Sequence, residues 1–169
     1  MMAKDVCPGK MCAMMCARHR VGKRVVTVTA APASPALLAP PVFSVGGVQY
    51  AFALHQDGAF FGRDGLIADG NFRPAQAGDV ITLYGVGFGA TTPAVPAGLV
   101  VASAAPLANP RVLFGDRPGE VLFGGLAPGA VGLYQFNVIV PPGISGDVSL
   151  SVTAGGATSR QSLRLTIAE

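Results

Sequence analysis

The sequence predicts an all-β fold in which short strands pack as a sandwich, and three observations support this prediction. Half of the 169 residues are apolar and only 12% are charged, which suits short buried strands. Turn-forming residues are abundant, with 23 glycines and 14 prolines between the apolar runs. Several runs alternate with the two-residue period of a strand. The length allows one domain, with room for an appended tail.

The segment 78–93 contains the strongest strand signal, and we expect the later strands to pack against it. Val80, Thr82 and Tyr84 fall on one face of an extended run, and Ile81 and Leu83 fall on the other. Both faces are mostly apolar, so the run predicts a central strand. Three glycines then interrupt it, at Gly85, Gly87 and Gly89. A phosphate-binding loop would need a helix after such glycines, and prolines follow instead.

Residues 1–24 form a basic, cysteine-containing leader that we expect to be poorly structured. Six Lys and Arg residues against one Asp give it a net charge of about +5, which leaves about −2 for the rest. Cys7, Cys12 and Cys16 are the three cysteines. On a helix, Cys12, Cys16 and His19 would share a face and could bind a metal, but their spacing matches no zinc pattern. Without interleaved aromatic residues, this tail predicts no nucleic-acid partner.

No membrane span is predicted, and the N-terminus lacks the pattern of an ordinary signal peptide. The apolar stretch 30–48 contains four prolines, and no other stretch approaches about 20 uninterrupted apolar residues. In the leader, Lys10 and the segment 7–9 interrupt what would be the apolar core of a signal peptide. An export signal would therefore be unusual or would belong to a longer parent protein.

Residues 25–41 predict one strand followed by a Pro/Ala-rich connection. The residues up to Ala30 alternate like a strand, which either begins the domain or ends a preceding module. The connection is a semi-rigid linker or an edge segment, because proline cannot donate a hydrogen bond to a neighbouring strand. The folded domain is then expected to span residues 42–169.

Two short strands over 42–45 and 48–54 are predicted around a Gly46-Gly47 turn, and an Asp-Gly turn follows. The loop beyond it carries Asp57, Asp64 and Asp69 among glycines. Carboxylate oxygens on a flexible loop are the ligands that calcium prefers. Because ordinary Asp-Gly turns explain the same residues, calcium stays an alternative and no cofactor is predicted.

Five further strands are expected in the second half of the chain, each ended by Gly or Pro. They cover residues 111–114, 120–123, 132–140, 148–153 and 162–167. In total, about seven to nine short strands at this spacing describe an immunoglobulin-like β-sandwich. We expect the two strongest strands, near residues 83 and 135, to lie in facing layers and to bury each other.

Five motifs follow one another along the chain: Phe52-Ala53-Leu54-His55-Gln56-Asp57-Gly58, Ile81-Thr82-Leu83-Tyr84-Gly85, Gly87-Phe88-Gly89, Val121-Leu122-Phe123-Gly124-Gly125-Leu126 and Gly132-Leu133-Tyr134-Gln135-Phe136-Asn137-Val138. In this order they resemble the C-terminal Ig-like domain of unknown function found in many secreted proteins of Solibacter-type acidobacteria, which is itself similar to IPT/TIG modules. The resemblance covers residues 35–167. It implies a β-sandwich attached to an extracellular or surface protein, and it brings no catalytic residues. Family members usually end much longer chains, and the leader has no counterpart in them.

We therefore expect a non-catalytic structural or interaction module of a secreted or cell-surface bacterial protein. Tyr50, Tyr84 and Tyr134 with Gln135 and Asn137 could form a polar and aromatic strip on one sheet. Such a strip would bind other domains, copies of the same chain, or a surface glycan or protein. The absence of tryptophan argues against an aromatic platform for carbohydrate.

The alternative is a small hydrolase whose carboxylates lie on loops at one end of the sandwich. Glycoside hydrolysis needs two carboxylates across a groove, and Glu120, Asp57, Asp69 and Asp116 are the candidates. His55 alternates onto the face of Asp57, so this pair could also serve a serine in an esterase. No Gly-x-Ser-x-Gly motif is present to supply that serine.

Overall fold

The computed structural model describes residues 16–21, 24–29 and 31–169, and the chain divides into two compact units, Met1–Pro32 and Ala33–Glu169. In the first unit, β1 (Cys16–Val21) and β2 (Arg24–Thr29) form an antiparallel pair. The metal hypothesis assumed a helix here, whereas Cys16 and His19 lie on a strand; Cys7 and Cys12 lie outside the described residues.

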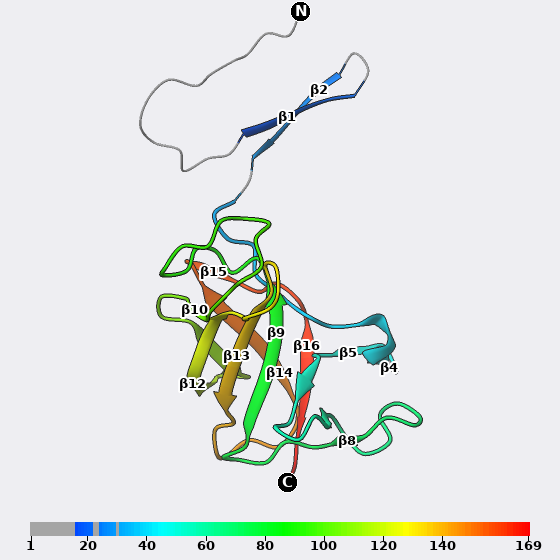
Figure 1. Cartoon of the computed structure of the whole chain (residues 1–169). Helices are drawn as coiled ribbons and strands as arrows, with labels where there is room; N and C mark the ends of the chain where they lie inside the picture. The colour runs from blue at the N-terminus through cyan, green and yellow to red at the C-terminus, as the bar shows by residue number, and fades with distance from the viewer. Residues whose placement is uncertain (1–15, 22–23, 30) are drawn as a thin grey trace, which may run out of the picture. The chain divides into compact units, whose positions relative to one another are not determined.

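The second unit contains fourteen strands and one short 3-10 helix (Figure 1). They are β3 (Ala36–Leu37), η1 (Pro41–Phe43), β4 (Ser44–Val45), β5 (Val48–Tyr50), β6 (Ala53–Leu54), β7 (Phe60–Phe61), β8 (Phe72–Arg73), β9 (Val80–Val86), β10 (Ala105–Pro106), β11 (Arg111–Phe114), β12 (Arg117–Leu126), β13 (Tyr134–Ile139), β14 (Gly146–Ala154), β15 (Ala157–Thr158) and β16 (Leu163–Ile167). No α-helix occurs among the described residues. The all-β prediction is confirmed. None of these elements is a helix long and apolar enough to cross a membrane.

Hydrogen bonds join the strands of this unit into one curled, mixed sheet. Its order is β4-β5-β16-β14-β11-β12-β13-β9-β6-β7-β8. Three short strands lie outside this order: β3 pairs with β9, β10 with β12 and β15 with β14. The bend lies within β12. The start of β12 pairs with β11 and the rest pairs with β13, so this one strand belongs to two layers. In Figure 1, β12, β13 and β9 run in front of β14.

The two strongest predicted strands are neighbours in one layer. β9 and β13 pair antiparallel, with Ile81 opposite Val138 and Leu83 opposite Phe136. The expectation that they lie in facing layers is therefore wrong. Alternation assigns each residue to a face of its strand, but it does not choose the neighbouring strand.

The core lies between the two layers, where side chains from both are fully buried. Those of the β9 and β13 layer are Ile81, Leu83, Phe136 and Val138, and those of the other layer include Val112, Val152 and Leu165. Burying each such side chain stabilises the fold by about 1.5–3 kcal/mol. A second, smaller cluster contains Phe43, Tyr50, Leu66 and Phe72, with Phe52 and Phe60 packed against it. It supports the segment that runs from η1 to β8.

Two features of the backbone in this fold require glycine: a turn with positive φ angles and a close approach between two strands. Gly46 and Gly47 have φ values of 59° and 79°, as expected for the predicted turn between β4 and β5. At Gly85, a Cβ atom would lie 2.4 Å from the carbonyl oxygen of Ala36. Only glycine therefore allows β3 to pair with the end of β9.

Candidate functional site

The carboxylates proposed for catalysis lie on separate segments of the fold. Asp57 follows β6, Asp69 lies in the β7–β8 loop, Asp116 forms the β11–β12 turn, and Glu120 lies within β12; all four are exposed. Asp64, the remaining calcium candidate, is exposed in the loop of Asp69. Within the described part of the chain, no three His, Cys, Asp or Glu side chains are grouped so as to hold a metal ion.

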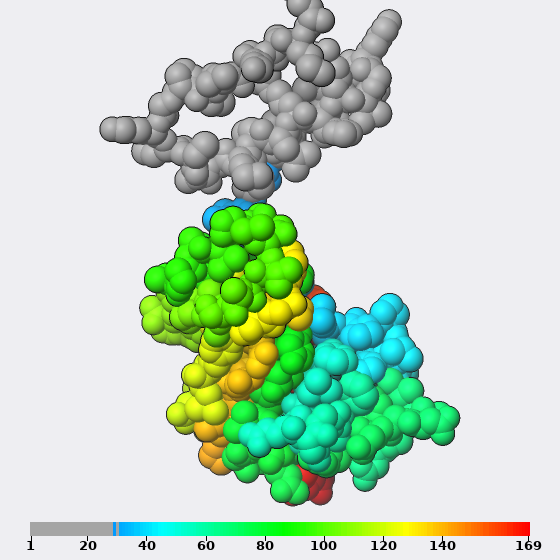
Figure 2. Space-filling view, viewed as in Figure 1, coloured from blue at the N-terminus to red at the C-terminus, as the bar shows by residue number. Residues whose placement is uncertain are grey.

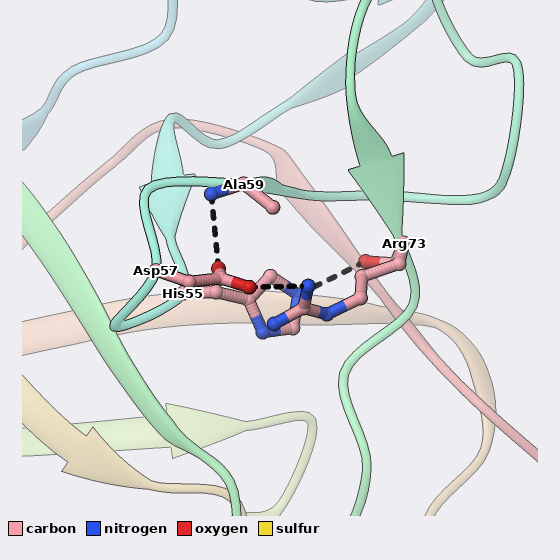
Figure 3. A network of polar contacts seen from close by, with 4 residues as sticks. All are labelled: His55, Asp57, Ala59 and Arg73. Atoms are coloured by element: carbon pink, nitrogen blue, oxygen red, sulfur yellow. Dashed lines mark hydrogen bonds and ion pairs between the residues drawn. The ribbon is translucent and has the colours of Figure 1, made fainter.

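Asp57 connects the turn after β6 with β8 (Figure 3). Its Oδ1 accepts a hydrogen bond from the backbone N–H of Ala59 at 3.1 Å, as expected for an Asp-Gly turn. Its Oδ2 forms an ion pair with Arg73 Nη1 at 2.7 Å. This hydrogen bond from Arg73, followed by the one from Ala59, lowers the pKa of the Asp57 carboxyl.

His55 lies beside this ion pair, but it bonds to the backbone. Its Nε2 lies 3.3 Å from the carbonyl oxygen of Arg73. A carbonyl only accepts, so Nε2 carries the proton and Nδ1 is the acceptor nitrogen of the ring. The ring is buried and stacks on Phe61, and this burial lowers the pKa of His55. Asp57 therefore does not orient His55 as the esterase hypothesis required.

A polar recess of about 340 Å³ surrounds these groups. Three segments line it: the turn after β6, the end of β8 and the entry to β9. The lining residues are His55, Gln56, Asp57, Arg73, Gly78, Asp79 and Val80. Sequence reasoning missed Arg73 and Asp79 as members of a site. Asp79 Oδ2 accepts a hydrogen bond from the backbone N–H of Gln76 at 2.9 Å, which fixes the carboxylate at the entry to β9.

A second candidate surface is the side of β9 and β13 that faces away from the core, which we name the outer face. Tyr84 lies opposite Gln135 and Thr82 lies opposite Asn137, so the four side chains share this face. Asn137 Oδ1 accepts hydrogen bonds from Gln135 Nε2 at 2.9 Å and from Thr82 Oγ1 at 3.3 Å. All four residues are half-buried.

Neighbouring strands extend the outer face with apolar side chains. Phe123 of β12 lies opposite Asn137, and Leu54 of β6 lies opposite Thr82. The ring centroid of Phe52 lies 6.2 Å from that of Tyr84. Figure 2 shows that atoms of β13, in orange, and of β9, in green, reach the surface of the molecule. The outer face is thus a mixed aromatic and amide surface.

Tyr134, which the sequence analysis grouped with these residues, lies on the opposite face of β13. It is 8% exposed, its ring packs near Phe88, and its hydroxyl donates to the carbonyl oxygen of Gly89. Burial raises the pKa of this hydroxyl. Tyr134 therefore takes no part in the outer face.

Tyr50 is also engaged inside the fold. Its hydroxyl donates to Asp147 Oδ2 at 2.5 Å, and Thr166 Oγ1 donates to Asp147 Oδ1 at 2.6 Å. Burial raises the pKa of Tyr50, and the hydrogen bond and charge of Asp147 add to the effect. Burial alone would raise the pKa of Asp147, but the bonds from Thr166 and Tyr50 lower it overall. This group ties β5 to β14 and β16.

Only one strand pairing behind this group was within reach of sequence reasoning. The sequence predicted that the last two long strands pair, but it did not predict their register. Continuing the register of β14 with β15 would place Asp147 opposite Arg164, whereas a two-residue shift before β16 places it opposite Thr166. The contribution of Tyr50 depends on the parallel pairing of β5 with β16, which no local sequence pattern predicts.

Comparisons with known proteins do not assign the chain to a family. No protein-family model, curated protein or solved structure matches it. The resemblance to acidobacterial Ig-like domains therefore stays a prediction.

Proposed function

We propose that this chain is a non-catalytic interaction module of a secreted or cell-surface bacterial protein, and that the outer face is its binding surface. The composition of this face is the observation that carries the proposal. Its central residues in register on β6, β9, β13 and β12 are aromatic, aliphatic, hydroxyl or amide residues: Leu54, Thr82, Tyr84, Gln135, Asn137 and Phe123. A charge enters only with Glu120, which lies opposite Ile139 at the end of β13. The cores of protein interfaces are likewise rich in aromatic residues and poor in charges.

A second copy of the chain is the partner that this chemistry favours. A two-fold interface brings the same residues of both copies together, so its chemistry has to be self-complementary. Side-chain amides and hydroxyls both donate and accept hydrogen bonds, so Gln135, Asn137 and Thr82 can pair with their own counterparts. A charged face would repel its copy. The order of motifs in the chain supports a secreted or surface protein as the setting.

The hydrolase alternative has less support in the geometry. A glycosidase needs one carboxyl group whose pKa is raised so that it can act as an acid, whereas the hydrogen bond from Arg73 lowers the pKa of Asp57. An esterase needs a histidine oriented by a carboxylate, whereas Nε2 of His55 is bonded to a backbone carbonyl.

Sedimentation velocity over a series of concentrations tests self-association. We expect the wild-type chain to form dimers. Gln135→Glu should raise the dissociation constant of the dimer at least tenfold, because two like charges would meet at the interface. Ser149→Glu is the control, since it adds the same charge to an exposed position of β14 in the other layer. Mixing Gln135→Glu with Gln135→Lys should restore a dimer.

Two results would contradict the proposal. A chain that remains monomeric at the highest soluble concentration would exclude a second copy as the partner. Hydrolysis of chromogenic glycosides or esters by the wild-type chain, lost in Glu120→Gln or Asp57→Asn, would show an enzyme instead. Both variants keep side-chain size and remove one negative charge.

A further inference from the structure

The polar recess between the turn after β6, β8 and the entry to β9 has the features of a ligand site distinct from the outer face. It holds a guanidinium, two carboxylates, an amide and an imidazole within one concave space, from Arg73, Asp57, Asp79, Gln56 and His55. Its volume of about 340 Å³ is at the small end of ligand pockets, which limits the ligand to about one sugar-sized ring.

The polar groups of this recess are held in place by bonds to the surrounding fold. Ala59 and Arg73 fix the two oxygens of Asp57, and the backbone N–H of Gln76 fixes Asp79. The carbonyl oxygen of Arg73 fixes His55. Binding then costs little side-chain entropy, because these groups are already oriented.

These groups also keep unused hydrogen-bonding capacity. Arg73 bonds Asp57 through Nη1, and a guanidinium has five N–H donors in total. Each carboxylate oxygen can accept more than one hydrogen bond, so Asp57 and Asp79 can still receive donors. The recess therefore presents donors and acceptors next to each other, at a side-chain exposure of 47% for Arg73 and 57% for Asp57.

The balance of charge selects among ligand classes. Two carboxylates and one guanidinium leave a net negative recess, which disfavours a phosphate or carboxylate ligand. A hydroxyl group both donates and accepts, so adjacent hydroxyls can donate to Asp57 or Asp79 and accept from Arg73. We propose that this recess binds a neutral sugar ring through its hydroxyl groups.

This site would recognise a sugar by hydrogen bonds rather than by stacking. No Phe, Tyr or Trp side chain is among the residues that line the recess, and the His55 ring is already stacked on Phe61; Val80 and Gly78 provide the apolar part. Such a site, small and without a stacking platform, is expected to bind one ring with a Kd of about 1–10 mM. Useful affinity for a surface glycan would then require several copies of the module.

An NMR titration of the ¹⁵N-labelled 169-residue chain tests the proposal. The neutral probes are D-glucose, D-galactose, D-mannose and N-acetyl-D-glucosamine, and the charged probes are inorganic phosphate and methylamine. We expect one or more of the sugars to shift the backbone amides of residues 55–57, 73 and 78–80 in a saturable way. Asp79→Asn and Arg73→Gln, made separately, should each weaken this binding at least tenfold.

Asp79→Asn is the sharper variant, because an asparagine oxygen still accepts the bond from Gln76 while the charge is lost. Asp116→Asn is its matched control on an exposed turn elsewhere, and it should leave binding unchanged. The proposal fails if no sugar shifts these amides, if only phosphate or methylamine does, or if both recess variants bind as tightly as the wild type. Dimerisation through the outer face is measured separately, so the two proposals can fail independently.

Discussion

The two faces of the β9 and β13 pair use the same strands for different purposes. On the inner face, Ile81, Leu83, Phe136 and Val138 have no exposed surface. On the outer face, the intervening residues are half-buried, and Thr82 and Gln135 are bonded to Asn137. The inner residues thus supply stability through burial, and we expect substitutions of the outer residues to cost less stability than substitutions of the inner ones. This difference lets a stable fold carry the proposed binding surface on its central strands.

The largest expected effect tests this comparison directly. Phe136→Ala removes a fully buried ring that packs 4.7 Å from the Phe88 ring centroid, and we expect it to lower the free energy of unfolding by about 3–5 kcal/mol. Gln135→Ala, the neighbouring residue on the outer face, should cost about 1 kcal/mol. Urea denaturation measures both. Similar losses for the two variants would remove the distinction between the faces.

Gly85→Ala sharpens the comparison at a position of the inner face that has no side chain. The new Cβ would lie 2.4 Å from the Ala36 carbonyl oxygen and 2.7 Å from the Phe88 ring, so β3 or the ring has to move. We expect a loss of about 1–3 kcal/mol in thermal or urea unfolding. The control is Val86→Ala, the next residue, which is 44% exposed and should cost much less. If Gly85→Ala left the free energy of unfolding unchanged, β3 or the Phe88 ring would have to move at no cost, which would contradict this prediction.

Tyr50→Phe tests whether a buried polar group stabilises the fold as the buried apolar side chains of the inner face do. Losing its bond to Asp147 should cost about 1–2 kcal/mol at neutral pH. Burial, then Asp147, raises the pKa of Tyr50 in the folded state, so this group's stability is present below pH 10 and is lost as the pH rises above it. Urea unfolding from pH 8 to pH 11 should show a shallower alkaline loss for the variant than for the wild type.

The smallest expected effect is the pH-dependent part of the stability change in His55→Gln, which adds to a pH-independent loss of ring packing on Phe61. Burial lowers the pKa of His55 in the folded state, so the unfolded chain binds its proton more readily. Wild-type stability should therefore fall as the pH drops below 6.5 toward the lowered pKa, and this part of the fall should be absent in the variant. An identical pH profile for both chains, measured by urea unfolding between pH 7.5 and pH 5, would contradict the buried, neutral state.

The sequence predicted the parts of this fold that depend on local patterns. The alternation around Leu83 and Phe136 matched the observed burial of both strands, and Asp57 acts as a turn residue. The same period places Tyr134 on the face opposite Gln135, so its exclusion from the outer face was predictable too. Pairing was not, because alternation leaves open which strand lies beside β9.

The polar recess could not be predicted for a related reason. Its residues come from three segments, and the ion pair between Asp57 and Arg73 spans sixteen residues of sequence. Neither Arg73 nor Asp79 is part of a motif with a known spacing. Only the return of β8 and the entry to β9 bring them near the turn after β6.

Strand β12 has a consequence for how the domain melts. Because its start is bonded to one layer and its remainder to the other, neither layer can open without releasing hydrogen-bond partners in its neighbour. Unfolding of Ala33–Glu169 should thus be a single cooperative transition, with amide hydrogen exchange in β9 and β14 limited by the same global event.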